Sequence, residues 1–244
     1  METRVERGAK TMTQRSIQAG KTPTVIIRVG ADVRVEGWDD ERVLANTASR
    51  WGLKVERRSA SEIGRVRARV GDRVLFDVHL DVKGLTRKDV GAEVTEVAIG
   101  SSGQVYVPLG SSVKVYAGKS AEVCDVRGDV AVYAGGDVHT RNVHTLVHAS
   151  AGGAMDLECE TIEGDDVKFE AGRDVRCHIR GLTDARLMIN DLGGYWEGVV
   201  GEGRAVIRIK AGGDVTLVTD QEVVPQPPDY VLGRVERPPD TSGV

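Results

Sequence analysis

The sequence predicts an all-β chain built as a parallel single-stranded β-helix, or β-solenoid, with coils of 17–20 residues. The first observation is a repeated phrase, in which alternating apolar residues are followed by Ala-Gly, a polar residue and another apolar one. The second is its spacing: the alanines of the five clear copies fall at 117, 134, 151, 171 and 211, in steps of 17, 17, 20 and 40. The third is the period of 2 within each copy, which is typical of strands. Units this short cannot bury an apolar face alone, so each must pack on a neighbour.

Aligning the copies on this alanine separates inward from outward positions. Two residues before it stand apolar side chains that we expect in the interior: Val115, Val132, Ala149, Phe169, Ile189 and Ile209. Three residues before it stand side chains that we expect to face solvent: Lys114, Ala131, His148, Lys168, Met188 and Arg208. The glycine after the alanine should lie at a corner, where angles unfavourable for other residues are often needed. We interpret the step of 40 as two coils of 20, with a degenerate copy at 187–191 stacked between its neighbours in sequence.

The first part of the chain is less regular. Residues 1–22 are polar and without periodicity, which predicts a flexible tail. Residues 23–97 predict an irregular β region that is continuous with the solenoid, beginning with the alternation at Val25. Within it, the stretch 66–82 fits either a hairpin or two successive strands of a coil.

The regular repeat predicts a solenoid over residues 98–222. Residues 223–244 hold five prolines and predict a flexible tail, because proline cannot donate a hydrogen bond to a ladder. The apolar patch of this tail, Tyr230-Val231-Leu232, could dock on the last coil or remain free.

Composition narrows the classes of partner. The 33 basic and 37 acidic residues give a net charge of −4, which offers no argument for nucleic-acid binding. No stretch has the ~20 apolar residues of a membrane span, and no apolar run follows the basic N-terminal residues as a secretory signal requires. These features predict a cytoplasmic protein without a membrane span. The three cysteines match no zinc-binding spacing.

Two stretches carry a family resemblance. The phrase Asp32-Val33-Arg34-Val35-Glu36-Gly37-Trp38-Asp39-Asp40 and the corner Gly135-Gly136-Asp137-Val138 resemble the putative-adhesin β-strand-repeat proteins of bacteria. That resemblance, over about 24–222, implies a single-stranded β-helix with no known catalytic residues and possible surface association. The solenoid is also similar to bactofilins, bacterial cytoskeletal filament formers with a short-period β-helix between disordered tails.

Metal binding has two candidate patterns, and neither is complete. The Gly-Gly-Asp corners suggest calcium, but Asp137, Asp174 and Asp214 do not form a continuous column, and a corner aspartate accepting backbone N–H bonds is the simpler interpretation. The histidines that could bind a metal share no column: His139, His144, His148 and His178. We therefore predict no metal, no cofactor and no catalytic residues.

Four aromatic residues are the candidate partner contacts. Tyr195 and Trp196 lie in the copy that breaks the glycine rule, within Gly-Gly-Tyr-Trp-Glu-Gly, and such a bulge could contact a partner. Tyr116 and Tyr133 share an outward column and could stack, either as the edge of a binding surface or as a pair between coils.

The residues of every repeat are explained by the packing of one copy on the next, and none of the repeats carries an evident reactive group. The leading hypothesis is a non-enzymatic structural protein that self-associates through a rigid solenoid into filaments or other homo-oligomers. The first alternative is an adhesin-like module that binds a protein or glycan. The second is a polysaccharide-active solenoid enzyme, which would need an acidic cluster beside a basic residue that the columns do not provide.

Overall fold

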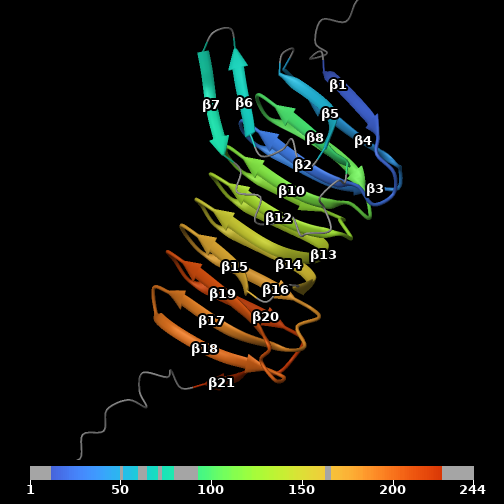
Figure 1. Cartoon of the computed structure of the whole chain (residues 1–244). Coiled ribbons are helices and arrows are strands. Elements are labelled where there is room, and N and C mark those ends of the chain that lie inside the picture. Colours follow the sequence, from blue (N-terminus) through green and yellow to red (C-terminus); the bar gives the residue numbers. More distant parts are fainter. Residues whose placement is uncertain are drawn as a thin grey trace, which may run out of the picture.

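The computed structural model describes residues 12–49, 52–59, 65–70, 73–79, 93–162 and 166–226. These residues form 21 strands and no helix, which confirms the predicted all-β class. Accordingly, this part of the chain holds no helix with the length and apolar character needed to cross a membrane. Figure 1 shows the strands stacked into an elongated body, with β1 and β5 near one end and β18 and β21 at the other.

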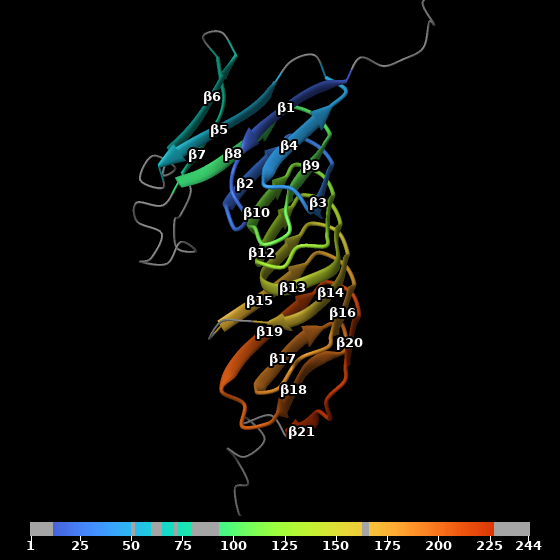
Figure 2. The ribbon, with the colours of Figure 1, turned by 90° about the vertical axis from the view of Figure 1, so that its right-hand side faces the viewer.

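Nineteen strands form one sheet that consists of two ladders. Strand β13 (Val138–Ala151) connects the ladders, because its first half pairs in one of them and its second half in the other. In spatial order, ladder A contains β5 (Leu53–Ser59), β8 (Glu93–Ile99), β2 (Thr24–Val29), β10 (Ser112–Ala117), β12 (Asp129–Ala134), the second half of β13, β15 (Asp166–Ala171), β19 (Ala205–Ala211), β17 (Ala185–Asp191), β18 (Gly194–Val200) and β21 (Val224–Gln226). Ladder B contains β1 (Thr13–Gln18), β4 (Arg42–Thr47), β9 (Gly103–Pro108), β3 (Val33–Trp38), β11 (Ala121–Cys124), the first half of β13, β14 (Met155–Ile162), β16 (Val175–Ile179) and β20 (Val215–Thr219). Figure 2 shows β15 and β19 on one side of the stack and β14, β16 and β20 on the other.

The repeat copies pair in parallel and in the register that the sequence predicts. Ala117 pairs with Ala134, and Ala134 pairs with Ala151, so each Ala-Gly corner lies directly over the next. The corner glycines make this possible: a Cβ on Gly135 would lie 2.5 Å from the carbonyl oxygen of Gly118. The period of the sequence is therefore the period of the backbone contacts along the middle of the stack.

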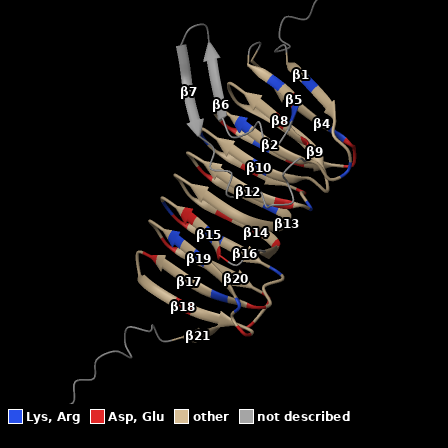
Figure 3. Cartoon of the chain, in the orientation of Figure 1, with Lys and Arg blue, Asp and Glu red and all other residues tan. Residues whose placement is uncertain are grey.

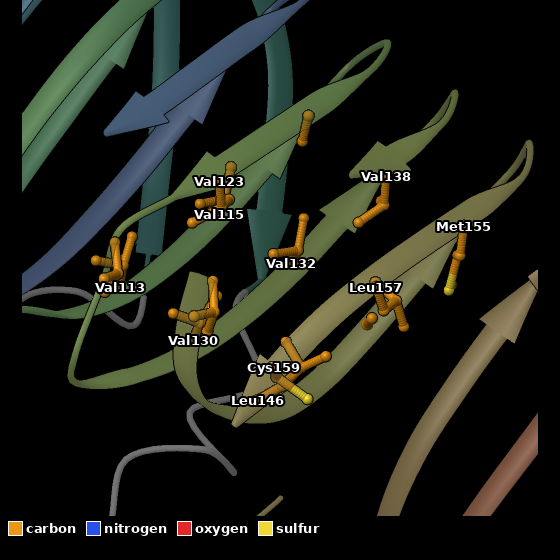
Figure 4. Packing of buried hydrophobic residues seen from close by; sticks show 14 of the residues in the cluster. Val113, Val115, Val123, Val130, Val132, Val138, Leu146, Met155, Leu157 and Cys159 are labelled. Carbon is orange, nitrogen blue, oxygen red and sulfur yellow. The ribbon is translucent and has the colours of Figure 1, made fainter. Parts of the chain in front are cut away.

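The core lies between the two ladders, as Figure 4 shows for the buried side chains of β10 to β14. The predicted interior residues Val115, Val132 and Phe169 are fully buried. In the third copy the register of β12 and β13 shifts between Val130 and Ala131, which pair with Leu146 and His148 and so skip Val147. This β-bulge puts Leu146 in the core and leaves Val147 half-buried.

The order of the stack differs from the order of the chain, which corrects one prediction. Ala171 pairs directly with Ala211, so nothing is stacked between the copies separated by 40 residues. The degenerate copy forms β17, which lies on the far side of β19, with Leu187 beside Ile207. At the other end, β2 lies between β8 and β10, although it precedes both of them in the chain.

Antiparallel strands at both ends also depart from a single-stranded helix. Strands β1, β4 and β9 pair antiparallel at one end, as do β17, β18 and β21 at the other. The predicted tail 1–22 therefore contains β1, whose Ile17 packs on the core, and the sparse apolar pattern of this edge strand explains why it was missed. The proline-rich tail 223–244 contributes the three residues of β21 before the described part ends.

The irregular region also holds a separate hairpin. Strands β6 (Arg65–Val70) and β7 (Arg73–His79) pair antiparallel, with Val70 opposite Arg73, which decides for the hairpin over two strands of a coil. The patch Tyr230-Val231-Leu232 lies outside the described residues.

Candidate functional site

A groove follows the corner where ladder B returns to ladder A. At this corner three levels carry Gly37, Asp125 and Asn142 over one another. Asp125 and Asn142 have positive φ angles of 58° and 53°, a conformation that these two residue types tolerate better than most. A Cβ on Gly37 would lie 1.9 Å from the carbonyl oxygen of Asp125, so only glycine fits the level of β3.

The groove has a volume of about 550 Å³. Its lining comes from five stretches of chain, which the stack brings side by side: Gly37, Trp38, Asp39, Leu109, Asp125, Arg127, Asn142, His144 and Glu160. We name it the Trp38 groove. A smaller hollow of about 330 Å³ lies over β3 and β11, where the ion pair between Arg34 and Glu122 (3.1 Å) forms part of its lining.

Trp38, in the lining of the groove, is held by three neighbouring side-chain and backbone groups. Its indole N–H donates to the carbonyl oxygen of Arg42 at 2.8 Å, and the guanidinium of Arg42 lies 5.7 Å from the ring centre. The ring of Tyr106 lies 5.4 Å away at an angle of 36°. The ion pair between Arg42 and Asp40 lowers the pKa of that carboxyl, because the hydrogen bond from Arg42 favours the charged form. Trp38 is thereby preorganised before any ligand arrives.

The polar groups of the groove supply both donors and acceptors. The amide of Asn142 donates to Oδ1 of Asp125 at 2.6 Å, and Nδ1 of His144 contacts Glu160. The side chain of Arg127 is exposed and has no ion-pair partner among the described residues, while its backbone N–H donates to the carbonyl of Leu109. The groove thus offers guanidinium and amide donors beside carboxylate acceptors.

Tyr116 and Tyr133 stack as expected, with ring centres 5.0 Å apart and an interplanar angle of 10°. His148 stacks on Tyr133 at 4.7 Å, and Arg28 lies 5.8 Å from the ring centre of Tyr116. Desolvation raises the pKa of both tyrosines and lowers that of His148. Neighbouring levels cover the ring faces, so this column offers a ligand mainly ring edges and hydroxyls.

Tyr195 and Trp196 lie on β18 at the C-terminal end of the stack, at 37% and 38% exposure. The Tyr195 hydroxyl donates to Glu197 at 2.8 Å. The indole of Trp196 lies against the backbone of Gly198, since a Cβ there would be 2.3 Å from its ring. The structure therefore keeps these two aromatics apart from Tyr116 and Tyr133, near the middle of the stack.

The aspartates of the corners accept backbone hydrogen bonds, as the simpler interpretation expected. The N–H of Ala154 donates to Oδ1 of Asp137 at 2.8 Å, and that of Asp214 to Oδ1 of Asp174 at 3.0 Å. The histidines are not brought together: His139 and His178 lie on ladder B, His144 at the groove and His148 on ladder A. Within the described ranges, no three His, Cys, Asp or Glu side chains gather as a metal site would require.

The three cysteines are buried and free. Burial raises the pKa of Cys124 to about 11 and that of Cys159 to about 12, and it raises the pKa of Cys177 strongly as well. These thiols remain protonated at neutral pH, which makes them poor nucleophiles.

Sequence reasoning missed the Trp38 groove. The sequence marked Trp38 only as part of the family phrase, because the strand that carries it pairs with the regular repeat at an offset of 88 residues. The available signal was the pair of left-handed-tolerant residues Asp125 and Asn142, 17 residues apart in the repeat.

No family model and no curated protein matches the chain. Among solved structures, the chain is similar to one described as a putative cell adhesion protein from Clostridium sporogenes ATCC 15579, at 7% sequence identity and a TM-score of 0.40. The match covers 86% of this chain and 100% of that one. These values do not establish a common family, and no match supports the resemblance to bactofilins.

Proposed function

We propose that the chain is a non-enzymatic, adhesin-like binding module that holds a glycan in the Trp38 groove, on a stack of strands organised as a β-solenoid. The observation that carries this proposal is the groove itself. It places a fixed aromatic side chain beside donors and acceptors from several levels of the stack.

The chemistry of the groove suits a neutral polyhydroxylated ligand. A sugar ring presents C–H groups that pack on an aromatic side chain, and hydroxyls that both donate and accept hydrogen bonds. Trp38 supplies the first kind of contact, Arg127 and Asn142 supply donors, and Asp39 and Glu160 supply acceptors. The carboxylates and the cationic groups lie side by side, so the groove favours neither a strong anion nor a strong cation.

Size and surface charge point the same way. A volume of about 550 Å³ lies in the range of pockets that take small ligands. Figure 3 shows acidic and basic residues interspersed along the stack, and such a mixed surface does not steer a polyanion such as nucleic acid.

The test is binding of the full chain to a panel of immobilised glycans, followed by calorimetry on those that bind. We expect Arg127→Ala to weaken binding by about tenfold or more, because it removes an exposed donor. The matched control is Arg176→Ala, since Arg176 is also exposed but lies on β16, away from the groove. Absence of binding across the panel, or equal affinity for the two variants, would contradict the proposal.

Self-association is a second candidate function, which one observation favours. Six large apolar residues are clearly exposed in the described part of the chain, and five of them lie between residues 192 and 224. Exposed apolar side chains gathered at one end of a soluble stack indicate an interaction surface.

A further inference from the structure

The smaller hollow over β3 and β11 lies at the opposite end of the strands that form the Trp38 groove. Strands β9, β3, β11 and the first half of β13 run parallel, so their first residues gather at one edge of ladder B and their last residues at the other. The Trp38 groove is lined mainly from the last residues of these strands and the turns after them, and the hollow from their first residues and the turns before them. We call it the Arg34 hollow.

The outward side chains of β3 connect the two hollows on one face. Val33 and Val35 are buried in the core, so the alternating Arg34, Glu36 and Trp38 stand on the outer face. Arg34 lines the hollow and Trp38 lines the groove, and at ~3.3 Å per residue they lie ~13 Å apart along the strand. A single sugar ring is shorter than this distance, whereas a short oligosaccharide reaches from one hollow to the other.

Tyr106 continues the aromatic surface of the groove toward the Arg34 hollow. It pairs with Glu36, whereas Trp38 pairs with Pro108, so Tyr106 lies two residues closer to the hollow than Trp38 does. Its half-buried ring is 5.4 Å from the ring of Trp38 and inclined to it by 36°. Two aromatic side chains that follow one another beside a strip of polar groups form a surface on which successive sugar rings can pack.

The Arg34 hollow offers both donors and acceptors. Arg34 bonds to Glu122 at 3.1 Å and to Glu36 at 3.4 Å, so its positive charge is compensated. His139 is exposed and has no hydrogen-bond or ion-pair partner among the residues that the structure describes. This mixture suits the hydroxyls of an uncharged chain, because a sulfated or phosphorylated chain would meet the carboxylates.

We propose that the glycan site extends from the Trp38 groove along the outer face of β3 into the Arg34 hollow, and that it takes a neutral linear oligosaccharide of at least about three units. This inference rests on the proposed function and adds to it a second subsite and a minimum length of the ligand. Because β3 holds the two subsites at a fixed separation, binding of one sugar at Trp38 brings the following units over Tyr106 and Arg34 without a second association from solution.

The experiment is calorimetry of the full chain with cello-, chito- and malto-oligosaccharides of increasing length, from the single sugar upward. In a series that binds, the affinity should rise at least about tenfold from one unit to about four and then level off. Arg34→Ala should remove most of this rise, whereas Arg127→Ala should weaken binding at every length, the single sugar included. Arg176→Ala is the matched control, because Arg176 stands in the same outward column of ladder B, two levels beyond His139.

Two histidine rings give a second measurement, by NMR, on the chain without substitutions. His144 lines the Trp38 groove and His139 lines the Arg34 hollow. A single sugar should shift the ring signals of His144 alone, and the oligosaccharide at which the affinity levels off should shift those of both histidines. The signals are assigned by their loss in His139→Ala and His144→Ala.

Three outcomes would overturn the extended site while the Trp38 groove still binds a glycan. They are an affinity that does not change with length, equal effects of Arg34→Ala and Arg176→Ala, and a His139 signal that stays in place when the longer oligosaccharide shifts that of His144. Absence of binding at any length, in these series and on the glycan panel alike, counts against the Trp38 groove itself and therefore against both proposals.

Discussion

Phe169 shows how closely the side chains of this chain follow their columns. It is the largest fully buried side chain among the described residues, and its neighbour Lys168 points outward to an ion pair with Asp166 at 3.4 Å. One step along the strand therefore changes the environment from a packed core to solvent.

This contrast predicts very different costs for two adjacent substitutions. Phe169→Ala should lower the free energy of unfolding by ~3–5 kcal/mol, because it leaves a cavity between the ladders. Lys168→Ala should lower it by less than about 0.5 kcal/mol, because it removes only an exposed ion pair. Urea unfolding of both variants checks the prediction, and similar losses would mean that the column assignment is wrong.

The repeated corner is the element that explains the Ala-Gly-Gly-Asp phrase. The first glycine lies against the carbonyl oxygen of the level before it: a Cβ on Gly152 would lie 2.3 Å from the carbonyl oxygen of Gly135. The second glycine leaves room for the preceding carboxylate, since a Cβ on Gly153 would lie 2.1 Å from Oδ1 of Asp137. At position 173 an arginine replaces the second glycine, and there the preceding level carries Ala154 in place of the aspartate. Lys119 is an exception, because it replaces the second glycine although the preceding level carries Asp32.

The corner predicts a coupling between Gly153 and Asp137. Gly153→Ala should cost about 1–3 kcal/mol in the natural chain, because the added methyl group meets the carboxylate of Asp137. In an Asp137→Ala chain the same substitution should cost at least about 1 kcal/mol less. A double-mutant cycle by urea unfolding measures this difference.

Gly152→Ala is the control for that cycle. Its clash is with the backbone of Gly135, so its cost should be the same whether residue 137 is aspartate or alanine. If Gly153→Ala shows no coupling to Asp137, the second glycine has another role.

The elements of the regular repeat could be predicted from the sequence because each rests on contacts between nearby copies. The alternation around Val115 and Val132 marks both the strand and its inward face. The bulge at Val147 could not be predicted, since Leu146 and Val147 are equally apolar and only packing decides between them. The Trp38 groove was missed for a related reason: Gly37 and Asp125 meet across 88 residues, where no repeat is visible.

At the scale of the whole molecule, the order of the levels follows long-range pairing and not chain order. Leu187 and Ile207 occupy equivalent columns, so the sequence is compatible with β17 on either side of β19. The pairing of β15 with β19 settles this order, and the antiparallel β17–β18 hairpin then lies outside the parallel levels. At the other end, β2 pairs with both β8 and β10, so an early segment forms an interior level.

This arrangement predicts that two N-terminal truncations differ sharply in effect. Removing residues 1–18 takes away β1, an edge strand that pairs with β4 alone among the described strands, so the rest should remain folded with a modest loss of stability. Removing residues 1–38 also takes away β2 and β3, which separate β8 and β9 from β10 and β11. The second truncation should therefore release β8 and β9 from the stack, while β12 to β16 keep their neighbours. Hydrogen exchange followed by mass spectrometry measures this directly: protection of residues 93–108 should be lost only in the shorter chain. Retained protection there would mean that β8 and β9 can re-pair with β10 and β11, and that the interior position of β2 is not required for the stack.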